Sequence, residues 1–173
     1  LNGAVLSNSK GTRATLSLSR ADGVQARQVN LEGARAEGAR FDAADLRDSN
    51  LRELRALGAG FEGANLEGAD LSGAALTGAN LRATKLAGAN LTGANLNDAD
   101  LVASEGLTPA QLCSAHGWRA ALLPGDEVSN STRPFRIDEP GRLRRVTELV
   151  CGARIEHAPE PAEGATTGAQ SPP

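Results

Sequence analysis

Between residues 31 and 101 the sequence repeats every five residues, and the period never slips. Every fifth residue in this stretch is apolar: Leu31, Ala36, Phe41, Leu46, Leu51, Ala56, Phe61, Leu66, Leu71, Leu76, Leu81, Leu86, Leu91, Leu96 and Leu101. A period of five fits neither the α-helix, with about 3.6 residues per turn, nor the two-residue alternation of a β-strand. We therefore expect the chain to turn at each repeat and to wind around a common axis.

A second series of small or apolar residues stands two places before the first. Most of its members are alanine, namely Ala34, Ala39, Ala44, Ala59, Ala64, Ala69, Ala74, Ala79, Ala89, Ala94 and Ala99, and the others are Val29, Ser49, Leu54 and Thr84. We number the places of a pentad from this residue, so the regular apolar residue is third. Glycine often occupies the fifth place, where it can supply the positive φ of a tight turn.

Stretches such as Ala64-Asn65-Leu66, Ala69-Asp70-Leu71 and Ala94-Asn95-Leu96 carry the motif A(D/N)LXX. This pattern resembles the pentapeptide-repeat family. The resemblance implies an all-β solenoid, a right-handed quadrilateral parallel β-helix with four pentads per coil. It also implies that the first and third places of each pentad point inward.

Four pentads per coil predict a second period of 20 residues. Phe41 and Phe61 obey it, so they should stack on the same side of consecutive coils. Ala36 and Ala56 are also 20 apart, and each precedes a phenylalanine within its own coil, which keeps the volume of the coil nearly constant. Leu54 is a large residue in a first place, and it compensates for the small volume of Ala56 in the third place of the same pentad.

The register of the first 30 residues is less regular. Leu6 and Leu16 follow Ala4 and Ala14 at the expected spacing, although Gly11, Ala21 and Ala26 are weak fillers. Residues 1–30 are therefore either the first coils or an irregular N-terminal segment, and 4–103 would make about five coils. Because the chain begins at Leu1 and contains no methionine, we expect a processed piece or a fragment, and a preceding module is left open.

The solenoid is expected over 31–106, followed by a C-terminal helical cap over 107–123. Thr108 can cap a short helix with Pro109 in its first turn, and Gly117 can end it. Leu107, Leu112 and Trp118 are expected to cover the last coil, and the family resemblance adds a homodimer interface at this end as an alternative. Residues 124–173 are predicted to be a mostly disordered tail with a short helix at 139–151.

Composition excludes several classes of function. Lys+Arg 18 against Asp+Glu 21 gives a net charge of -3, without the basic excess that direct nucleic-acid binding needs. The sequence has no apolar run long enough to span a membrane, and its two cysteines favour a reducing cytoplasm, so we expect a cytoplasmic protein. The family resemblance implies a bacterial one. No catalytic motif occurs, and a rod with a filled interior offers no cleft, so we predict no enzyme activity and no cofactor.

The two histidines and two cysteines could nominally supply four zinc ligands, as Cys113-x-x-His116 and Cys151-x5-His157. Their spacing is poor. We therefore interpret the cysteines as small buried residues and the histidines as solvent-facing, and we predict no metal site.

Charged residues 20 apart should stack on neighbouring coils, as Glu32 over Arg52 and Arg47 over Glu67 would. We expect mixed faces that present a protein-binding surface to a partner the sequence does not identify. The family resemblance gives an alternative, a DNA mimic that binds a type II topoisomerase. Over 31–105, twelve acids stand against seven bases, and Arg82 and Lys85 interrupt the acidic columns. The candidate face for either partner consists of Asp22, Asp42, Asp45, Glu62 and Glu67.

Overall fold

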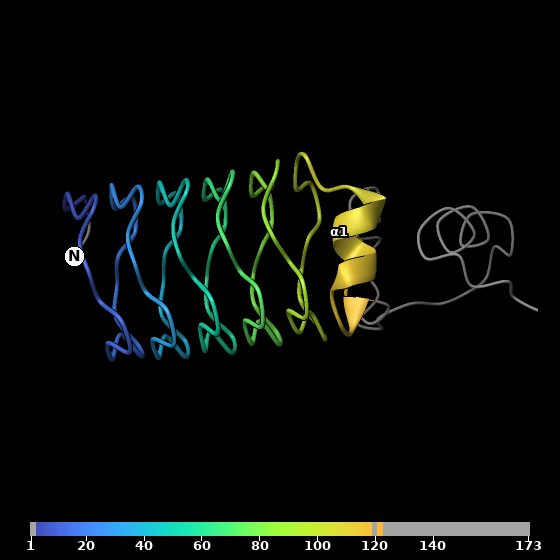
Figure 1. Ribbon diagram of the computed structural model, residues 1–173, viewed down its shortest axis with the longest axis horizontal. Helices are drawn as coiled ribbons and strands as arrows, with labels where there is room; N and C mark the ends of the chain where they lie inside the picture. The colour runs from blue at the N-terminus through green and yellow to red at the C-terminus, as the bar shows by residue number, and fades with distance from the viewer. Residues whose placement is uncertain (1–2, 119–120, 123–173) are drawn as a thin grey trace, which may run out of the picture.

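The computed structural model describes residues 3–118 and 121–122. The chain winds into a column of stacked coils, and one helix lies at its C-terminal end (Figure 1). Each second-place residue forms a parallel bridge with the residue 20 positions later, from Val5 with Gln25 to Lys85 with Glu105. The coils are therefore four pentads long, and residues 3–30 share the register of the later ones. Between neighbouring coils the described residues pair through bridges of one residue each.

The four pentads of a coil form four walls, which we call sides I to IV in chain order from residue 9. Side I contains pentads 9–13, 29–33, 49–53, 69–73 and 89–93. Side II contains 14–18, 34–38, 54–58, 74–78 and 94–98. Side III contains 19–23, 39–43, 59–63, 79–83 and 99–103. Side IV contains 4–8, 24–28, 44–48, 64–68 and 84–88, and lies opposite side II.

The place of a residue in its pentad determines the hydrogen-bond acceptor of its backbone N–H group. The third- and fifth-place N–H groups donate to the following coil, and the second-place group donates to the preceding coil. The first-place group of the next pentad closes a turn onto the third-place carbonyl, as in Ala74 N to Leu71 O at 3.0 Å. The fourth-place N–H has no such backbone acceptor. A second-place Asn or Asp accepts it instead, as Asp70 Oδ1 accepts from Ser72 N at 3.0 Å.

This side-chain bond explains why Asn and Asp recur in the second place. It forms in nine pentads, and their acceptors are Asn30, Asp45, Asn50, Asn65, Asp70, Asn80, Asn90, Asn95 and Asp100. A short polar side chain two residues before an N–H can reach it without distorting the backbone. The second-place Asn or Asp thus accepts the one backbone N–H of the pentad that has no backbone acceptor.

Every fifth-place residue from Gly3 to Ala103 has a positive φ. Gly73 has φ 67° and Asp48 has φ 57°. A positive φ at the second central residue is what a type II turn requires, and glycine adopts it without steric cost. The corners of the column are therefore the reason for the glycines in the fifth place.

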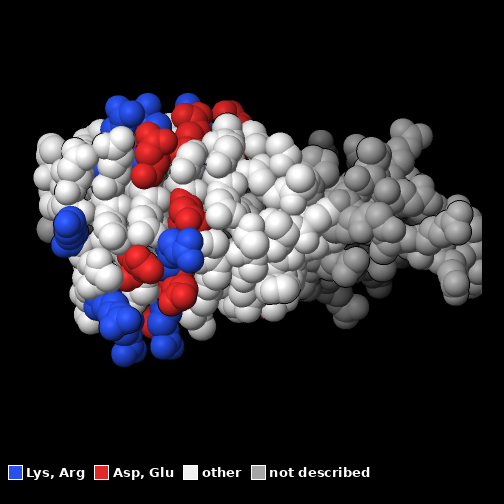
Figure 2. Space-filling view, viewed as in Figure 1, with Lys and Arg blue, Asp and Glu red and all other residues white. Residues whose placement is uncertain are grey.

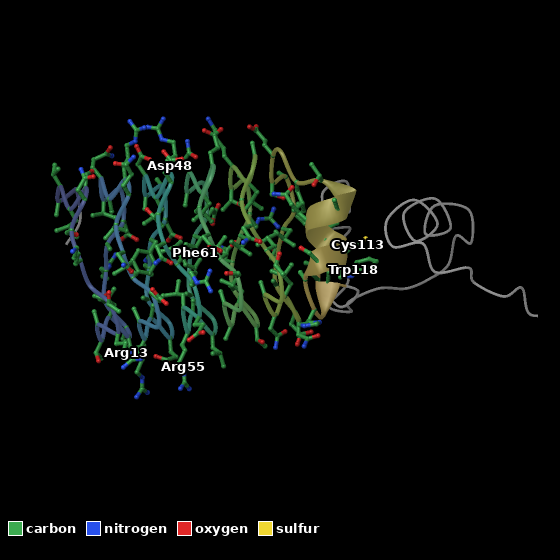
Figure 3. All side chains as sticks on the ribbon, in the orientation of Figure 1. Arg13, Asp48, Arg55, Phe61, Cys113 and Trp118 are labelled. Carbon is green, nitrogen blue, oxygen red and sulfur yellow. The ribbon has the colours of Figure 1, made fainter. Side chains whose placement is uncertain are left out.

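The first and third places fill the interior of the column. The rings of Phe41 and Phe61 stack with centroids 5.2 Å apart and an interplanar angle of 14°, which confirms the prediction made from their spacing. Leu54 and Ala56 are both buried, in agreement with their expected compensation. Figure 3 shows Phe61 between the walls of the column.

The interior is not completely filled near the N-terminal end of the column. A cavity of about 150 Å³ lies there, and its lining includes Gly11, Ala21 and Ala26 at third places that hold leucine or phenylalanine in most later coils. Leu6 and Leu16 are only partly buried beside it. The small third-place residues of this region thus leave space that later coils fill.

Helix α1, Pro109–Ser114, closes the C-terminal end. Thr108 and Gln111 form a reciprocal capping box at its start. The Gln111 side chain also donates Nε2 to the carbonyls of Leu86 and Ala89, both at 2.8 Å, so an amide group pairs with part of the last coil edge. The chain then resumes the coil pattern, because His116 bridges to Asn95.

Leu112 and Trp118 are buried and Leu107 is partly buried against the core, at the C-terminal end of the column. The predicted tail at 124–173, its helix at 139–151 and the pair Cys151 and His157 lie outside the described residues.

Candidate interaction surface

The outer walls carry the charged residues, and their distribution along the column is uneven. Residues 3–55 contain nine Lys or Arg and seven Asp or Glu, whereas residues 56–118 contain two and six. The visible face in Figure 2 shows charges of both signs over the N-terminal coils and a mostly uncharged surface beyond them. The walls are therefore mixed in sign at one end and mostly neutral or acidic towards the other.

The ion pairs do not run along the columns, which corrects the expectation that charges 20 residues apart would pair. In all eight pairs of the described residues, the partners are separated by 2 residues within a coil or by 18 between coils. Residues of one column project in parallel from stacked backbones. Second-place and fourth-place columns stand side by side on the same wall, so their side chains meet diagonally.

The five candidate acids are divided between two walls. Asp22, Asp42 and Glu62 lie on side III, and Asp45 and Glu67 lie on side IV. Three arginines pair with three of these carboxylates: Arg20 lies 3.7 Å from Asp22, Arg40 lies 3.4 Å from Asp22 and 2.9 Å from Asp42, and Arg47 lies 2.6 Å from Asp45. The hydrogen bond from Arg47 lowers the pKa of Asp45 below its usual 3.8, against the effect of burial.

Asp42 has a second contact that the five-residue pattern did not predict. Its Oδ1 accepts the backbone N–H of Glu62 at 3.0 Å, one coil further on. The second place of that pentad is Gly60, which has no side chain to accept this N–H, and a Cβ on Gly60 would lie 2.7 Å from Asp42 Oδ1. Asp42 thus replaces the missing Asn or Asp of the next coil, so its role is structural. The signal was present in the sequence as a glycine in a second place.

Side II carries a different arrangement of charge. Glu37 accepts a hydrogen bond from Ser17 Oγ, and the hydrogen bond is the main cause of its lowered pKa. Its Oε1 lies 3.6 Å from Arg35 Nε and 3.4 Å from Arg55 Nε, so one carboxylate stands between two arginines of successive coils. Both arginine side chains remain about three-fifths exposed.

The same wall exposes two leucines. Leu18 is 81% exposed and lies over Gly38, where its Cδ2 would be 2.9 Å from a Cβ. Leu57 is 44% exposed, and its carbonyl accepts the N–H of the same Gly38. The two leucines therefore lie on the same wall, on the two coils that flank the coil of Gly38. They stand in fourth and fifth places where polar residues or glycine are usual, which is the signal that could have identified them.

The described part of the chain contains neither a cluster of possible metal ligands nor a helix that could span a membrane. In residues 3–118 and 121–122 no group of three or more His, Cys, Asp or Glu side chains could hold a metal ion. No helix within those residues is long and apolar enough to cross a bilayer. Cys113 lies on α1, is partly exposed and is not a free thiol, which corrects its interpretation as a small buried cysteine, and His116 is exposed in the coil that follows.

The comparisons agree with this architecture. The family description Pentapeptide repeats matches residues 27–56 and 64–102 in eight copies. A solved pentapeptide repeat protein from the thylakoid lumen of Arabidopsis thaliana is 35% identical, with a TM-score of 0.55, over 57% of this chain and 68% of that one. The chain belongs to the pentapeptide repeat family. Its column is accordingly a right-handed β-helix.

Two further solved relatives are less similar. HetL, a pentapeptide repeat protein involved in heterocyst differentiation regulation in a Nostoc cyanobacterium, is 24% identical with a TM-score of 0.41, over 73% of this chain and 65% of that one. QnrB1, a plasmid-mediated fluoroquinolone resistance protein, is 21% identical with a TM-score of 0.36, over 70% and 63%. No curated protein matches the sequence.

Proposed function

We propose that this pentapeptide repeat protein is a non-catalytic scaffold whose outer walls bind a partner protein. The observation that supports this function is the filled column: leucine, alanine and phenylalanine side chains of the chain itself occupy the interior. The surface that remains for recognition is the set of four walls. General acid/base catalysis needs a concave, partly dry site with suitably shifted pKa values. Here the pKa values of Glu37 and Asp45 are lowered by contacts on outward walls.

A comparison of the four walls tests the scaffold function. One variant per side removes a positive charge from the outer surface: Arg52→Gln on side I, Arg35→Gln on side II, Arg40→Gln on side III and Arg47→Gln on side IV. Each immobilised full-length variant is compared with the wild type in quantitative capture from a bacterial lysate, after circular dichroism has confirmed an unchanged fold. We expect one variant to lose a captured protein that the other three retain. The proposal would be contradicted if all four variants captured the same proteins in equal amounts, or if neither the wild type nor any variant captured a protein.

The alternative is a DNA mimic that binds a type II topoisomerase through Asp22, Asp42, Asp45, Glu62 and Glu67. Mimicry of a duplex needs a continuous acidic strip. These residues lie on two walls, and arginines pair with three of them. A gyrase supercoiling assay with and without a fluoroquinolone separates the two functions. The scaffold function predicts neither inhibition nor protection, and inhibition that is lost in Glu62→Gln would favour the mimic.

The burial of Leu112 and Trp118 supports their role as a cap on the last coil. A homodimer interface at this end would have to use the exposed surface around them. Sedimentation of the full chain against concentration tests this alternative directly.

A further inference from the structure

We propose that side II binds an acidic segment of a partner protein that also carries apolar side chains. This inference rests on the proposed scaffold function and names the wall and the kind of partner. The binding strip consists of Leu18, Arg35, Glu37, Arg55 and Leu57, which lie on three successive coils of one wall.

The first argument is the state of the two guanidinium groups. On the other walls, Arg40, Arg47, Arg52 and Arg82 each donate a side-chain hydrogen bond to an aspartate. Within the described residues, Arg35 and Arg55 approach Glu37 as ion pairs but donate no side-chain hydrogen bond. A guanidinium group carries five N–H donors in a planar fork that fits a carboxylate. The guanidinium groups of Arg35 and Arg55 on side II can therefore donate hydrogen bonds to a carboxylate of a partner.

The second argument is the arrangement of Glu37 between them. Ser17 and the two arginines hold this carboxylate from three directions. It offsets part of the repulsion between arginines on adjacent coils, but one negative charge against two positive charges leaves the strip with a net charge of +1. The strip therefore favours an anionic partner, and its side chains are partly ordered before binding, which lowers the entropy cost of association.

The third argument is the apolar surface beside the charges. Val5, Leu18 and Leu57 are the large apolar residues that are exposed among the described residues, and two of the three lie on side II, on either side of the coil that carries Gly38. Bare phosphate or a nucleic-acid backbone would leave these leucines in water. A protein segment that presents acidic and apolar side chains on the same face would cover the leucines and place carboxylates at the arginines. Figure 3 shows Arg55 projecting outward at the edge opposite Asp48 of side IV.

The test uses the full chain and a short fluorescein-labelled peptide that carries both glutamate and leucine at every second position, so that one face of the extended peptide holds both kinds of side chain, measured by fluorescence anisotropy. We expect saturable binding that weakens at higher salt. The double variant Arg35→Gln/Arg55→Gln should weaken it by about tenfold or more, because charge-assisted hydrogen bonds are lost. Leu18→Asn/Leu57→Ser should also weaken it, and asparagine tolerates the positive φ at position 18.

Arg27→Gln and Val5→Ser are the matched controls, because both residues are exposed on the opposite side IV. They should leave binding unchanged. Peptides with lysine in place of glutamate, or serine in place of leucine, should bind weakly or not at all.

Equal weakening by the side IV controls, tighter binding of a DNA duplex through the same arginines, or absence of peptide binding would overturn the proposal. So would a dimer in sedimentation experiments that the side II variants dissociate, because the strip would then be an interface between two copies. If the peptide does not bind but the variant of another side loses a captured protein that the other variants retain, the inference fails and the scaffold function stands. If no wall shows selective loss, the scaffold function itself fails.

Discussion

The replacement of a missing asparagine by Asp42 can be tested as a closed thermodynamic cycle. In wild type, Asp42 Oδ1 accepts the N–H of Glu62 at 3.0 Å because Gly60 has no side chain. Asp42→Ala should cost about 1–2 kcal/mol for this bond to a charged acceptor at an exposed site. The ion pair with Arg40 adds at most about 1 kcal/mol, because Arg40 is about half exposed.

A second substitution, Gly60→Asn, should remove most of the destabilisation that Asp42→Ala causes. An asparagine in the second place accepts the fourth-place N–H in six other pentads. Its Cβ would meet Asp42 Oδ1 at 2.7 Å, but this atom ends a side chain that can rotate away. In the Gly60→Asn background, Asp42→Ala should therefore cost less than about 1 kcal/mol, which gives a coupling of about 1 kcal/mol between the two sites.

Thermal unfolding followed by circular dichroism measures all four corners of the cycle. A destabilisation of about 1 kcal/mol should lower Tm by about 3–5 °C in a column of about 120 residues. Arg40→Gln is the control for the ion pair and should lower stability by less than Asp42→Ala. The reasoning is refuted if Asp42→Ala costs the same in both backgrounds, or if Gly60→Asn alone abolishes the fold.

Three further predictions concern other parts of the column. Ala26→Leu should raise stability by about 1–2 kcal/mol in urea unfolding, because it adds a leucine to the partly empty interior, and a lower midpoint would contradict the cavity. The lowered pKa of Asp45 contributes stability that is present above pH 3.8 and is lost as the pH falls through the folded-state pKa; Asp45→Asn should reduce this acid dependence in melts between neutral and acid pH. Gln111→Ala removes two hydrogen bonds to the last coil and should cost about 1–3 kcal/mol, with faster amide exchange confined to the C-terminal coil.

The repeat length determines most of the fold. A five-residue period forces a turn at each pentad, and the 20-residue spacing of Phe41 and Phe61 is enough to predict that their rings stack. The burial of Leu112 and Trp118 also follows from a visible pattern, a capped helix with apolar residues after the last repeat. These features depend on residue type and spacing alone.

The surface could not be predicted to the same extent, because it depends on which side chains meet across a wall. Column position suggested pairs 20 residues apart, whereas the arginines reach diagonally to neighbouring columns. The roles of Asp42 and Glu37 depend on distances of a few ångströms to a backbone N–H or to two guanidinium groups. A residue pattern does not specify these distances.

The most direct test of the architecture is the unfolding of Leu71→Asp compared with Thr92→Asp. Both substitutions add one carboxylate to side I, but Leu71 is fully buried in the column and Thr92 is exposed on its wall. We expect Leu71→Asp to lose at least about 4 kcal/mol and to unfold several coils, and Thr92→Asp to melt within a few degrees of wild type. A wild-type melting curve for Leu71→Asp would contradict the inward orientation of the third-place residues.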